Sequence, residues 1–564
     1  MTDTFPAVSR RGFFKAAAAL TATTGLGAQI AEASPMGSSS WNPGMQTVPG
    51  NQPELPFLHG VASGDPLPNS VILWTRVTPQ ADALPGTGIG ERVEVKWEVA
   101  ADPSFRHVAQ QGTTVTSAER DHTVHVDATG LKANSVYYFR FTVLDGAYAG
   151  RTSPVGRTKT APVAGENVKQ LNFAFASCAN WEAGYFEAYQ DMATRALAGE
   201  LDFTVFLGDY IYEYGTGGYV GKHGVVRPTS PKWEILNLSD YRQRYGHYRT
   251  DLYLQNAHAA LPWIAMWDDH ETANNAWREG AENHTPGAEG SWAGRREAAL
   301  QAYFEWMPVR ATSPSQQGHI YRTLQFGDLM QLTMLDLRTY RDSETSVANF
   351  GNPDRTMLGG EQFNWVAAQI EQSTAAWNVL GTSVMIAPLK LLTIAHSWEA
   401  TEALRFARQQ TTGFAINSDQ WDGYAAERDR LLELVAAKNA NTLFITGDIH
   451  SEWANSIHHG GREVAVEMVC TSISSANIDD LLTDKTKIEH APNNSTSLLV
   501  EGMLRDANRW VKHLDFDAHG YSIAHLRRDE VAVDFVRVNN VELAESGVSV
   551  ALTKAWRPGE GFVR

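Results

Sequence analysis

The alternation of hydrophobic and polar positions changes near residue 162. In the preceding hundred or so residues, short runs alternate apolar and polar side chains, as in 93–99 and 137–143. Such alternation is typical of antiparallel strands with one buried face. Leu131 followed by Tyr137 resembles the tyrosine corner of immunoglobulin-like and fibronectin-like sandwiches. We therefore predict a small all-β domain over residues 57–162.

From residue 168 onward, apolar runs of strand length alternate with segments of helical period, which predicts a layered α/β (α+β) domain. The predicted strands are 171–176, 202–207, 263–266, 321–326, 329–336, 442–446, 464–470 and 530–536, and the predicted helices are 182–197, 239–260, 360–372 and 425–438. Two long loops, 213–235 and 273–292, are rich in Gly, His and Asn and are expected to border an active site. This domain is predicted to span 168–550, followed by a C-terminal tail at 551–564.

The N-terminus has the pattern of an export signal. Arg10 and Arg11, followed by an Ala/Leu/Thr-rich stretch to about Ile30, resemble a twin-arginine signal. We predict a signal peptide over 1–33 and a Pro/Gly/Ser-rich linker over 34–56. The chain would then engage the twin-arginine translocase and end in the periplasm or outside the cell. A membrane anchor is the alternative, but the apolar run is short, and no later run is long enough to span a bilayer.

Charge and composition narrow the classes of function. The 564 residues carry a formal net charge of −17, and 43% of them are hydrophobic. This hydrophobic fraction suffices for folded cores, and the length suggests two or more domains. An acidic chain lacks the basic surface that a nucleic-acid scaffold or a binder of anionic membranes needs. An enzyme of this charge acting on anionic substrates would need bound cations to create a local positive field.

Three acidic clusters each follow an apolar strand. They are Gly-Asp-Tyr-Ile-Tyr at 208–212, Trp-Asp-Asp-His-Glu at 267–271 and Gly-Asp-Ile-His at 447–450. Oxygen and imidazole donors that converge at strand carboxyl ends suit hard, multivalent cations. Each cluster alone has a structural alternative: a turn with packed tyrosines, a solvated loop, or a turn with a surface histidine. Their recurrence after three apolar strands favours a metal site.

Side-chain chemistry within the clusters refines this prediction. Asp209 and Tyr212 can reach one metal if the residues between them turn, and a phenolate is a good ligand for ferric iron. The neighbouring carboxylates of Asp268 and Asp269 repel each other, so their burial would require cations. One of them would bridge two metals while His270 reaches a substrate oxygen. Neutral oxygen donors suited to calcium follow at Asn274 and Asn275.

The order of these motifs resembles the metallophosphatase superfamily and, more closely, the PhoD-type alkaline phosphatases/phosphodiesterases. Further segments resemble that family along nearly the whole chain: 57–66, 73–76, 177–178, 335–341, 358–362, and 421–428. The resemblance implies a metallophosphatase-like layered sandwich preceded by the small β-domain. It also implies one ferric and two calcium ions.

By resemblance, each candidate residue acquires a role. The implied metal ligands are Cys178, Asp209, Tyr212, Asp268, Asp269, Asn275, Asp448 and His450, and the implied catalytic residues are His270, Asp269 and His450. Iron would be bound through Cys178, Asp209 and Tyr212 together with one carboxylate of the Asp268–Asp269 pair. Calcium would be bound through Asp209, Asp448 and one asparagine of the 274–275 pair. His450 would complete the metal site or contact substrate. The choices between Asp268 and Asp269, and between Asn274 and Asn275, stay open.

The two cysteines allow two interpretations. In an exported protein, Cys178 and Cys470 could form a disulfide. A metal-bound Cys178 must instead be a thiolate, and folding in a reducing cytoplasm disfavours the bridge. We expect Cys178 to be a metal ligand and Cys470 to be a buried thiol.

The expected function is metal-dependent hydrolysis of phosphate mono- and diesters, in which a metal-bound hydroxide or oxide attacks phosphorus. A small-molecule or polymeric phosphate ester is the expected substrate. One alternative is a phospholipase D-like phosphodiesterase on the same scaffold. The other is a non-enzymatic exported surface-binding protein, which would leave the ordered acidic clusters unexplained.

Overall fold

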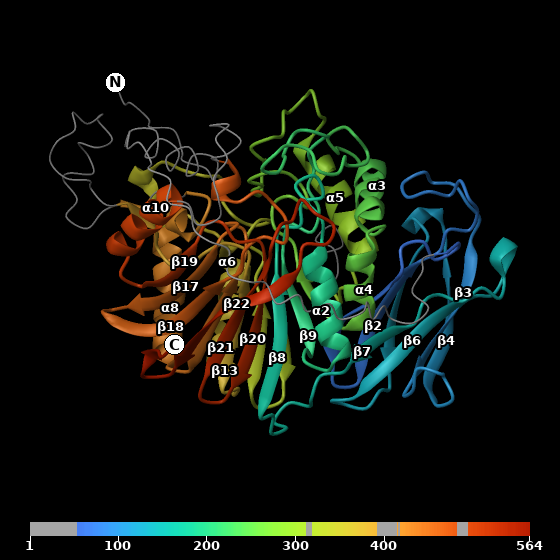
Figure 1. Ribbon diagram of the computed structural model, residues 1–564, viewed down its shortest axis with the longest axis horizontal. Coiled ribbons are helices and arrows are strands. Elements are labelled where there is room, and N and C mark those ends of the chain that lie inside the picture. Colours follow the sequence, from blue (N-terminus) through green and yellow to red (C-terminus); the bar gives the residue numbers. More distant parts are fainter. Residues whose placement is uncertain (1–53, 312–317, 392–413, 416–417, 482–494) are drawn as a thin grey trace, which may run out of the picture.

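The computed structural model describes residues 54–311, 318–391, 414–415, 418–481 and 495–564. The predicted signal peptide and nearly all of the predicted linker lie outside these residues. Two large sheets, stacked face to face, form the centre of the molecule, and a smaller four-stranded sheet lies at one end (Figure 1).

The largest sheet has ten strands. In spatial order they are β23 (Gly561–Phe562), β22 (Val548–Arg557), β21 (Val531–Val538), β20 (Gly520–Arg527), β8 (Gln170–Ala176), β9 (Phe203–Leu207), β10 (Trp263–Met266), β1 (Val61–Leu67), β2 (Ser70–Arg76) and β5 (Thr123–Thr129). The neighbours β8, β9 and β10 run parallel, so their carboxyl ends lie at one edge.

The facing sheet has seven strands. Their order is β11 (Arg322–Phe326), β12 (Met330–Met334), β13 (Trp377–Thr382), β16 (Asn441–Thr446), β18 (Arg462–Val469), β17 (Glu452–His459) and β19 (Val511–Asp515). Apolar side chains from both sheets share one core, which includes Val205 of β9 and Ile445 of β16. Because β9 is buried along its whole length, its residues form a continuous apolar run instead of an alternating one.

Helices cover the outer faces of the two sheets. On the ten-stranded sheet they are α2 (Glu187–Leu197), α3 (Leu238–Tyr248), α4 (Leu252–Ala260) and α5 (Trp292–Trp306). On the seven-stranded sheet they are α6 (Gly359–Gln372), α8 (Ala425–Lys438) and α10 (Ser495–Ala507). A second core under α6 and α8 contains Val366, Leu431 and Phe444. The layered α/β prediction is confirmed.

The N-terminal region is all-β, as predicted, but it is not separated from the rest. Its second sheet has the order β4 (Val108–Thr116), β3 (Val93–Ala100), β6 (Val136–Val143) and β7 (Gly156–Lys159). Strand β1 pairs with β10, so β1, β2 and β5 extend the ten-stranded sheet. The Tyr137 hydroxyl accepts a hydrogen bond from the Lys132 N–H at 2.9 Å, which confirms the tyrosine corner.

Three predicted boundaries differ from the structure by more than a residue or two. The single helix predicted over 239–260 is two helices, because Asp251 caps the N–H groups of Tyr253 and Leu254 and starts α4. Helix α2 begins at Glu187, five residues later than predicted. The predicted tail at 551–564 is wrong, since β22 and β23 complete the sheet and Trp556 is buried against Trp377.

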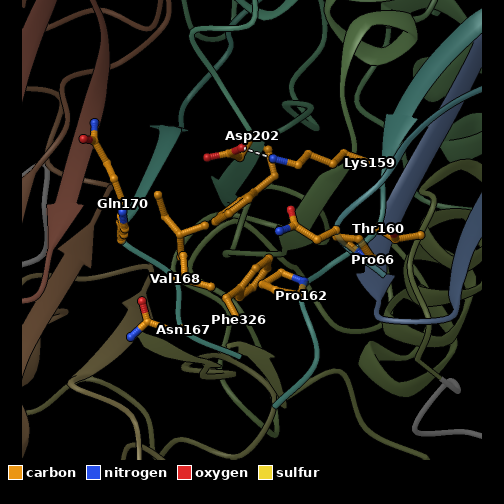
Figure 2. A pocket seen from close by; sticks show the side chains of 13 residues that line it. Pro66, Lys159, Thr160, Pro162, Asn167, Val168, Gln170, Asp202 and Phe326 are labelled. Carbon is orange, nitrogen blue, oxygen red and sulfur yellow. Dashed lines mark hydrogen bonds and ion pairs between the residues drawn. The ribbon is translucent and has the colours of Figure 1, made fainter. Parts of the chain in front are cut away.

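A pocket of about 320 Å³ lies at the junction of the N-terminal region with the large sheet (Figure 2). It is lined at the amino ends of β8 and β9 by Gln170 and Phe203, and the Lys159–Asp202 ion pair of 2.6 Å borders it. Cys178 and the first acidic cluster follow the opposite, carboxyl ends of β8 and β9. This pocket is therefore separate from the candidate site.

Candidate metal centre

The candidate residues of all three clusters meet where the two sheets face each other. Cys178 follows β8, Asp209 follows β9, and Asp268 and Asp269 follow β10. Asp448 and His450 follow β16 in the facing sheet. Every one of these side chains is buried. Adjacent strands of two sheets thus bring together residues that are up to 272 positions apart, from Cys178 to His450.

The backbone at these positions is strained. Left-handed φ angles occur at Cys178 (61°), Asp209 (58°), Asn275 (53°), Asp448 (66°) and His450 (51°), where most side chains are disfavoured. Such conformations persist only where surrounding structure enforces them, and they cluster at functional sites. The glycine before Asp209 is also required, because a Cβ at Gly208 would lie 2.3 Å from Cβ of Asp268.

One group of donors combines sulfur, nitrogen and oxygen. Ligand atoms of Cys178, Asp209 and His450 lie within 4.8 Å of one another. The Tyr212 hydroxyl donates to Asp209 Oδ2 at 3.1 Å and lies 3.3 Å from His450 Nε2. We call these four residues the mixed cluster. Its donor types suit a transition metal.

The orientation of His450 is fixed from behind. Its Nδ1 lies 2.7 Å from the carbonyl oxygen of Ala476. A carbonyl only accepts, so Nδ1 carries the hydrogen and Nε2 presents its lone pair toward the mixed cluster. This arrangement is typical of metal-binding histidines, in which a second group sets the tautomer.

A second group of donors contains only oxygen. Carboxylates of four residues offer ligand atoms within 4.8 Å of one another: Asp209, Asp268, Asp269 and Asp448. We call them the oxygen cluster. Such a set suits a hard cation such as calcium. Asp209 belongs to both clusters and can therefore bridge two ions.

Arg338 partly neutralises the oxygen cluster. Its Nε and Nη2 donate to the two carboxylate oxygens of Asp268, the latter at 2.8 Å. It also lies 3.3 Å from Asp448 and 2.9 Å from Asp419. Asp269, by contrast, lies 3.8 Å from Arg338. Arg338 is therefore an ion-pair partner of the oxygen cluster.

His270 is held by a carboxylate that the sequence analysis missed. Its Nδ1 lies 2.7 Å from Glu213 Oε2, and its Nε2 has no hydrogen-bond partner among the described residues. Burial lowers the pKa of His270, but the carboxylates of Asp269, Glu213 and Asp209 outweigh it and raise the pKa to about 10. Glu213 immediately follows Tyr212, and an acidic residue within that apolar run was the available signal.

Glu271 organises the turns that carry the aspartates. Its carboxylate accepts hydrogen bonds from the backbone N–H groups of Asp209 (3.1 Å), Tyr210 (2.6 Å) and Asp268 (2.8 Å). Burial raises the pKa of Glu271 to about 7, against the effect of these hydrogen bonds. The function of Glu271 is to connect the ends of β9 and β10.

We expect Glu271→Gln to disturb both clusters. The amide of glutamine cannot accept with its nitrogen, so a buried N–H loses its partner at a cost of about 1–3 kcal/mol. By displacing Asp209 and Asp268, the change should lower kcat/KM by about 10–100-fold. Urea denaturation and steady-state assays would measure both effects, with the exposed Glu297→Gln as control. Wild-type values for Glu271→Gln would contradict this role.

The asparagines following His270 are distinguished by their side chains. Asn275 Oδ1 is buried and has no hydrogen-bond partner among the described residues. The Asn275 N–H donates to Asp269 Oδ2 at 2.6 Å. The Asn274 N–H donates instead to Glu213 at 2.7 Å. Asn275 therefore has the oxygen that is available to a cation.

The cysteines do not form a disulfide. Cys178 belongs to the mixed cluster, and its Sγ lies 3.2 Å from Ser177 Oγ. The Cys470 thiol donates to the Thr446 carbonyl at 3.3 Å, and burial raises the pKa of Cys470 to about 12. Cys470 is thus a buried, protonated thiol.

Comparison with protein families agrees with this geometry. A model described as PhoD-like phosphatase matches residues 173–535, and one described as PhoD-like phosphatase, N-terminal domain, matches residues 44–162. The chain belongs to the PhoD-like phosphatase family. Alkaline phosphatase D of Bacillus subtilis (strain 168) is 40% identical over 467 residues, which cover 78% of this chain and 74% of that relative.

Solved structures give the same picture. A structure of PhoD superposes with a TM-score of 0.77 at 34% identity, covering 92% of this chain and 93% of that chain. Purple acid phosphatase PPD1 from yellow lupin (Lupinus luteus) matches with a TM-score of 0.50 at 11% identity, covering 88% and 73%. That second likeness shows the metallophosphatase fold alone.

This PhoD-like phosphatase is therefore a hydrolase of phosphate esters, and its buried clusters of carboxylates, thiol and imidazole can bind metal ions. The predictions of the family, the fold and the enzyme class are confirmed. Among the described residues, no helix has both the length and the hydropathy needed to cross a bilayer.

Proposed function

We propose that this PhoD-like phosphatase hydrolyses phosphate mono- and diesters at a centre of one ferric and two calcium ions. One observation supports this proposal: Asp209 belongs both to the mixed cluster and to the oxygen cluster, which differ in their donor atoms. The mixed cluster offers a phenol and a thiol, which as anions favour a Lewis-acidic transition metal. The oxygen cluster offers the ligands that calcium prefers.

The residues fit such ions in two further respects. The buried Oδ1 of Asn275 has no hydrogen-bond partner among the described residues, as expected for a ligand of a cation. The carboxylates of the oxygen cluster, buried beside the Arg338 guanidinium, carry an excess of negative charge that bound cations would neutralise.

We assign the ligands as follows. Iron would be held by the mixed cluster: Cys178, Asp209, Tyr212 and His450. Calcium would be held by Asp209, Asp269, Asp448 and Asn275. Asp269 is preferred over Asp268 because Arg338 already binds both oxygens of Asp268. Asp268 then acts by holding Arg338 beside the centre.

The chain itself supplies a proton donor. His270 is oriented through Nδ1 by Glu213, and its buried Nε2 is available to a leaving oxygen. Burial lowers the pKa of His270, and the neighbouring carboxylates of Asp269, Glu213 and Asp209 raise it, which favours the protonated imidazole. We propose that Nε2–H protonates the leaving alkoxide. Bound metal ions would supply neutralisation of the phosphoryl oxygens and acidification of the attacking water.

A substrate panel on the purified enzyme tests the proposed activity. We expect hydrolysis of both p-nitrophenyl phosphate and bis-p-nitrophenyl phosphate, with iron and calcium in the protein by elemental analysis. Chelation of calcium should abolish turnover, and added calcium should restore it. Hydrolysis of phospholipids alone would favour a phospholipase D-like enzyme instead. A protein containing zinc alone would contradict the metal assignment.

We also propose export by the twin-arginine route, supported by Arg10 and Arg11 before an apolar stretch. Replacing both arginines with lysine should retain phosphatase activity in the cytoplasmic fraction. Unchanged export of the double variant would contradict this route.

A further inference from the structure

Two carboxylates hold the side-chain amide of Asn275 in one orientation. Its Nδ2 donates to Glu282 Oε2 at 2.7 Å and to Glu344 Oε1 at 2.7 Å. An amide nitrogen has two hydrogens, so both are used. The flipped amide would place its oxygen against two acceptors, which would repel it. The positions of the nitrogen and the oxygen are therefore fixed by this contact.

The two glutamates are themselves held in place. Glu282 Oε2 also accepts from Asn274 Nδ2 at 2.8 Å. Glu344 Oε2 accepts from the Ser418 hydroxyl at 2.9 Å. The contacts join a loop after β10, the segment after β12 and the segment before α8. Such a network restricts the amide far more than either hydrogen bond alone.

The oxygen of the Asn275 amide, unlike the nitrogen, has no hydrogen-bond partner among the described residues. Asn275 is 2% exposed, so this oxygen is buried. The Asn275 N–H donates to Asp269 Oδ2 at 2.6 Å, which joins this residue directly to the oxygen cluster. A buried amide oxygen without a partner is costly unless a cation occupies the space before it.

We propose that Glu282 and Glu344 are positioning residues for the calcium site. They hold Nδ2 of Asn275 so that Oδ1 is presented to a cation in the oxygen cluster. Burial raises the pKa of Glu344 to about 7. Orienting the amide requires only the acceptor oxygens of the two glutamates. This inference rests on the proposed function, since it assumes that calcium occupies the oxygen cluster.

Glutamine substitutions test this role with little change of shape. We would prepare Glu282→Gln, Glu344→Gln and the double variant in the full chain. The matched control is Glu279→Gln, three residues before Glu282, whose side chain is 77% exposed. In each protein, calcium affinity, calcium and iron content, melting temperature and kcat at saturating calcium would be measured.

We expect calcium affinity to fall about 10–100-fold in the single variants and further in the double variant, as for loss of outer-shell partners at other metal sites. Iron content should not change, because Glu282 and Glu344 act through Asn275, and Asn275 is not part of the mixed cluster. Saturating calcium should restore the wild-type kcat. The control should bind calcium as the wild type does.

Other outcomes would overturn the inference in distinguishable ways. Wild-type calcium affinity in the double variant would show that the glutamates do not position a ligand. A variant could instead lose both iron and calcium and melt at a lower temperature, with no recovery on adding calcium. That result would show that the glutamates have a general structural role. A wild-type enzyme that binds no calcium at all would refute the proposed function, and this inference with it.

Discussion

Replacing Asp209 with alanine is expected to abolish phosphate-ester hydrolysis and to remove both kinds of metal from the protein. Asp209 is the residue common to the mixed cluster and the oxygen cluster. Its Oδ2 accepts from the Tyr212 hydroxyl, so its loss also releases Tyr212. We expect kcat/KM to fall by at least about 10³-fold, more than the loss of a single oxyanion-hole donor usually costs.

Steady-state kinetics and elemental analysis of the same preparation would measure this effect. Asp209→Asn keeps the shape of the side chain and separates loss of charge from loss of fold. Asp529→Ala, at an exposed position, provides the control. An Asp209→Ala protein that retains either iron or more than a tenth of the wild-type activity would contradict the bridging role.

Replacing Cys178 with serine is expected to remove iron while calcium remains. Cys178 belongs to the mixed cluster, and the oxygen cluster does not include it. A serine hydroxyl ionises far less readily than a thiol and is a poor ligand for the same metal. We expect activity to fall by more than the roughly 10–100-fold that loss of an outer-shell partner costs.

The second cysteine provides a matched control. Cys470 donates to the Thr446 carbonyl and lies outside both clusters, so Cys470→Ser should keep its iron and its activity. Iron content by elemental analysis and the visible absorption of a phenolate-bound ferric ion would distinguish the two variants. Equal iron in Cys178→Ser and the wild type would disprove the ligand assignment.

Much of the site followed from the sequence, because parallel strands gather their carboxyl ends. Strands β8, β9 and β10 are short apolar runs, and each is followed directly by a candidate ligand: Cys178, Asp209 and Asp269. The prediction that these residues converge required only that the strands be neighbours. The same pattern identified Asp448 and His450 after β16 in the facing sheet, whereas the role of Cys178 and the identities of the metals came from the family resemblance.

The residues that hold the candidate ligands in place could not be predicted from the strand pattern. Glu344 contacts Asn275 across 69 positions, and Arg338 contacts Asp268 across 70. No local pattern encodes such pairs, because they depend on how loops fold over the sheet edge. The left-handed backbone at Asp209 is likewise enforced by tertiary contacts, including the hydrogen bond from its N–H to Glu271.

The errors in the fold prediction have similar causes. The helical period continues from 239 to 260, but the local cap at Asp251 divides the segment into α3 and α4. The prediction placed residues 551–557 in a tail, but they belong to strand β22. They form a strand because β21 offers an unpaired edge for backbone hydrogen bonds.

We propose that a ferric ion and calcium share Asp209. Anomalous X-ray diffraction data, collected from crystals of the enzyme at energies just above and just below the iron absorption edge, would test this proposal most directly. We predict one anomalous peak for iron in contact with Cys178 Sγ, Tyr212, His450 Nε2 and Asp209, with calcium density in the oxygen cluster on the other side of Asp209. Iron located away from Cys178, or the same transition metal in both clusters, would contradict the claim.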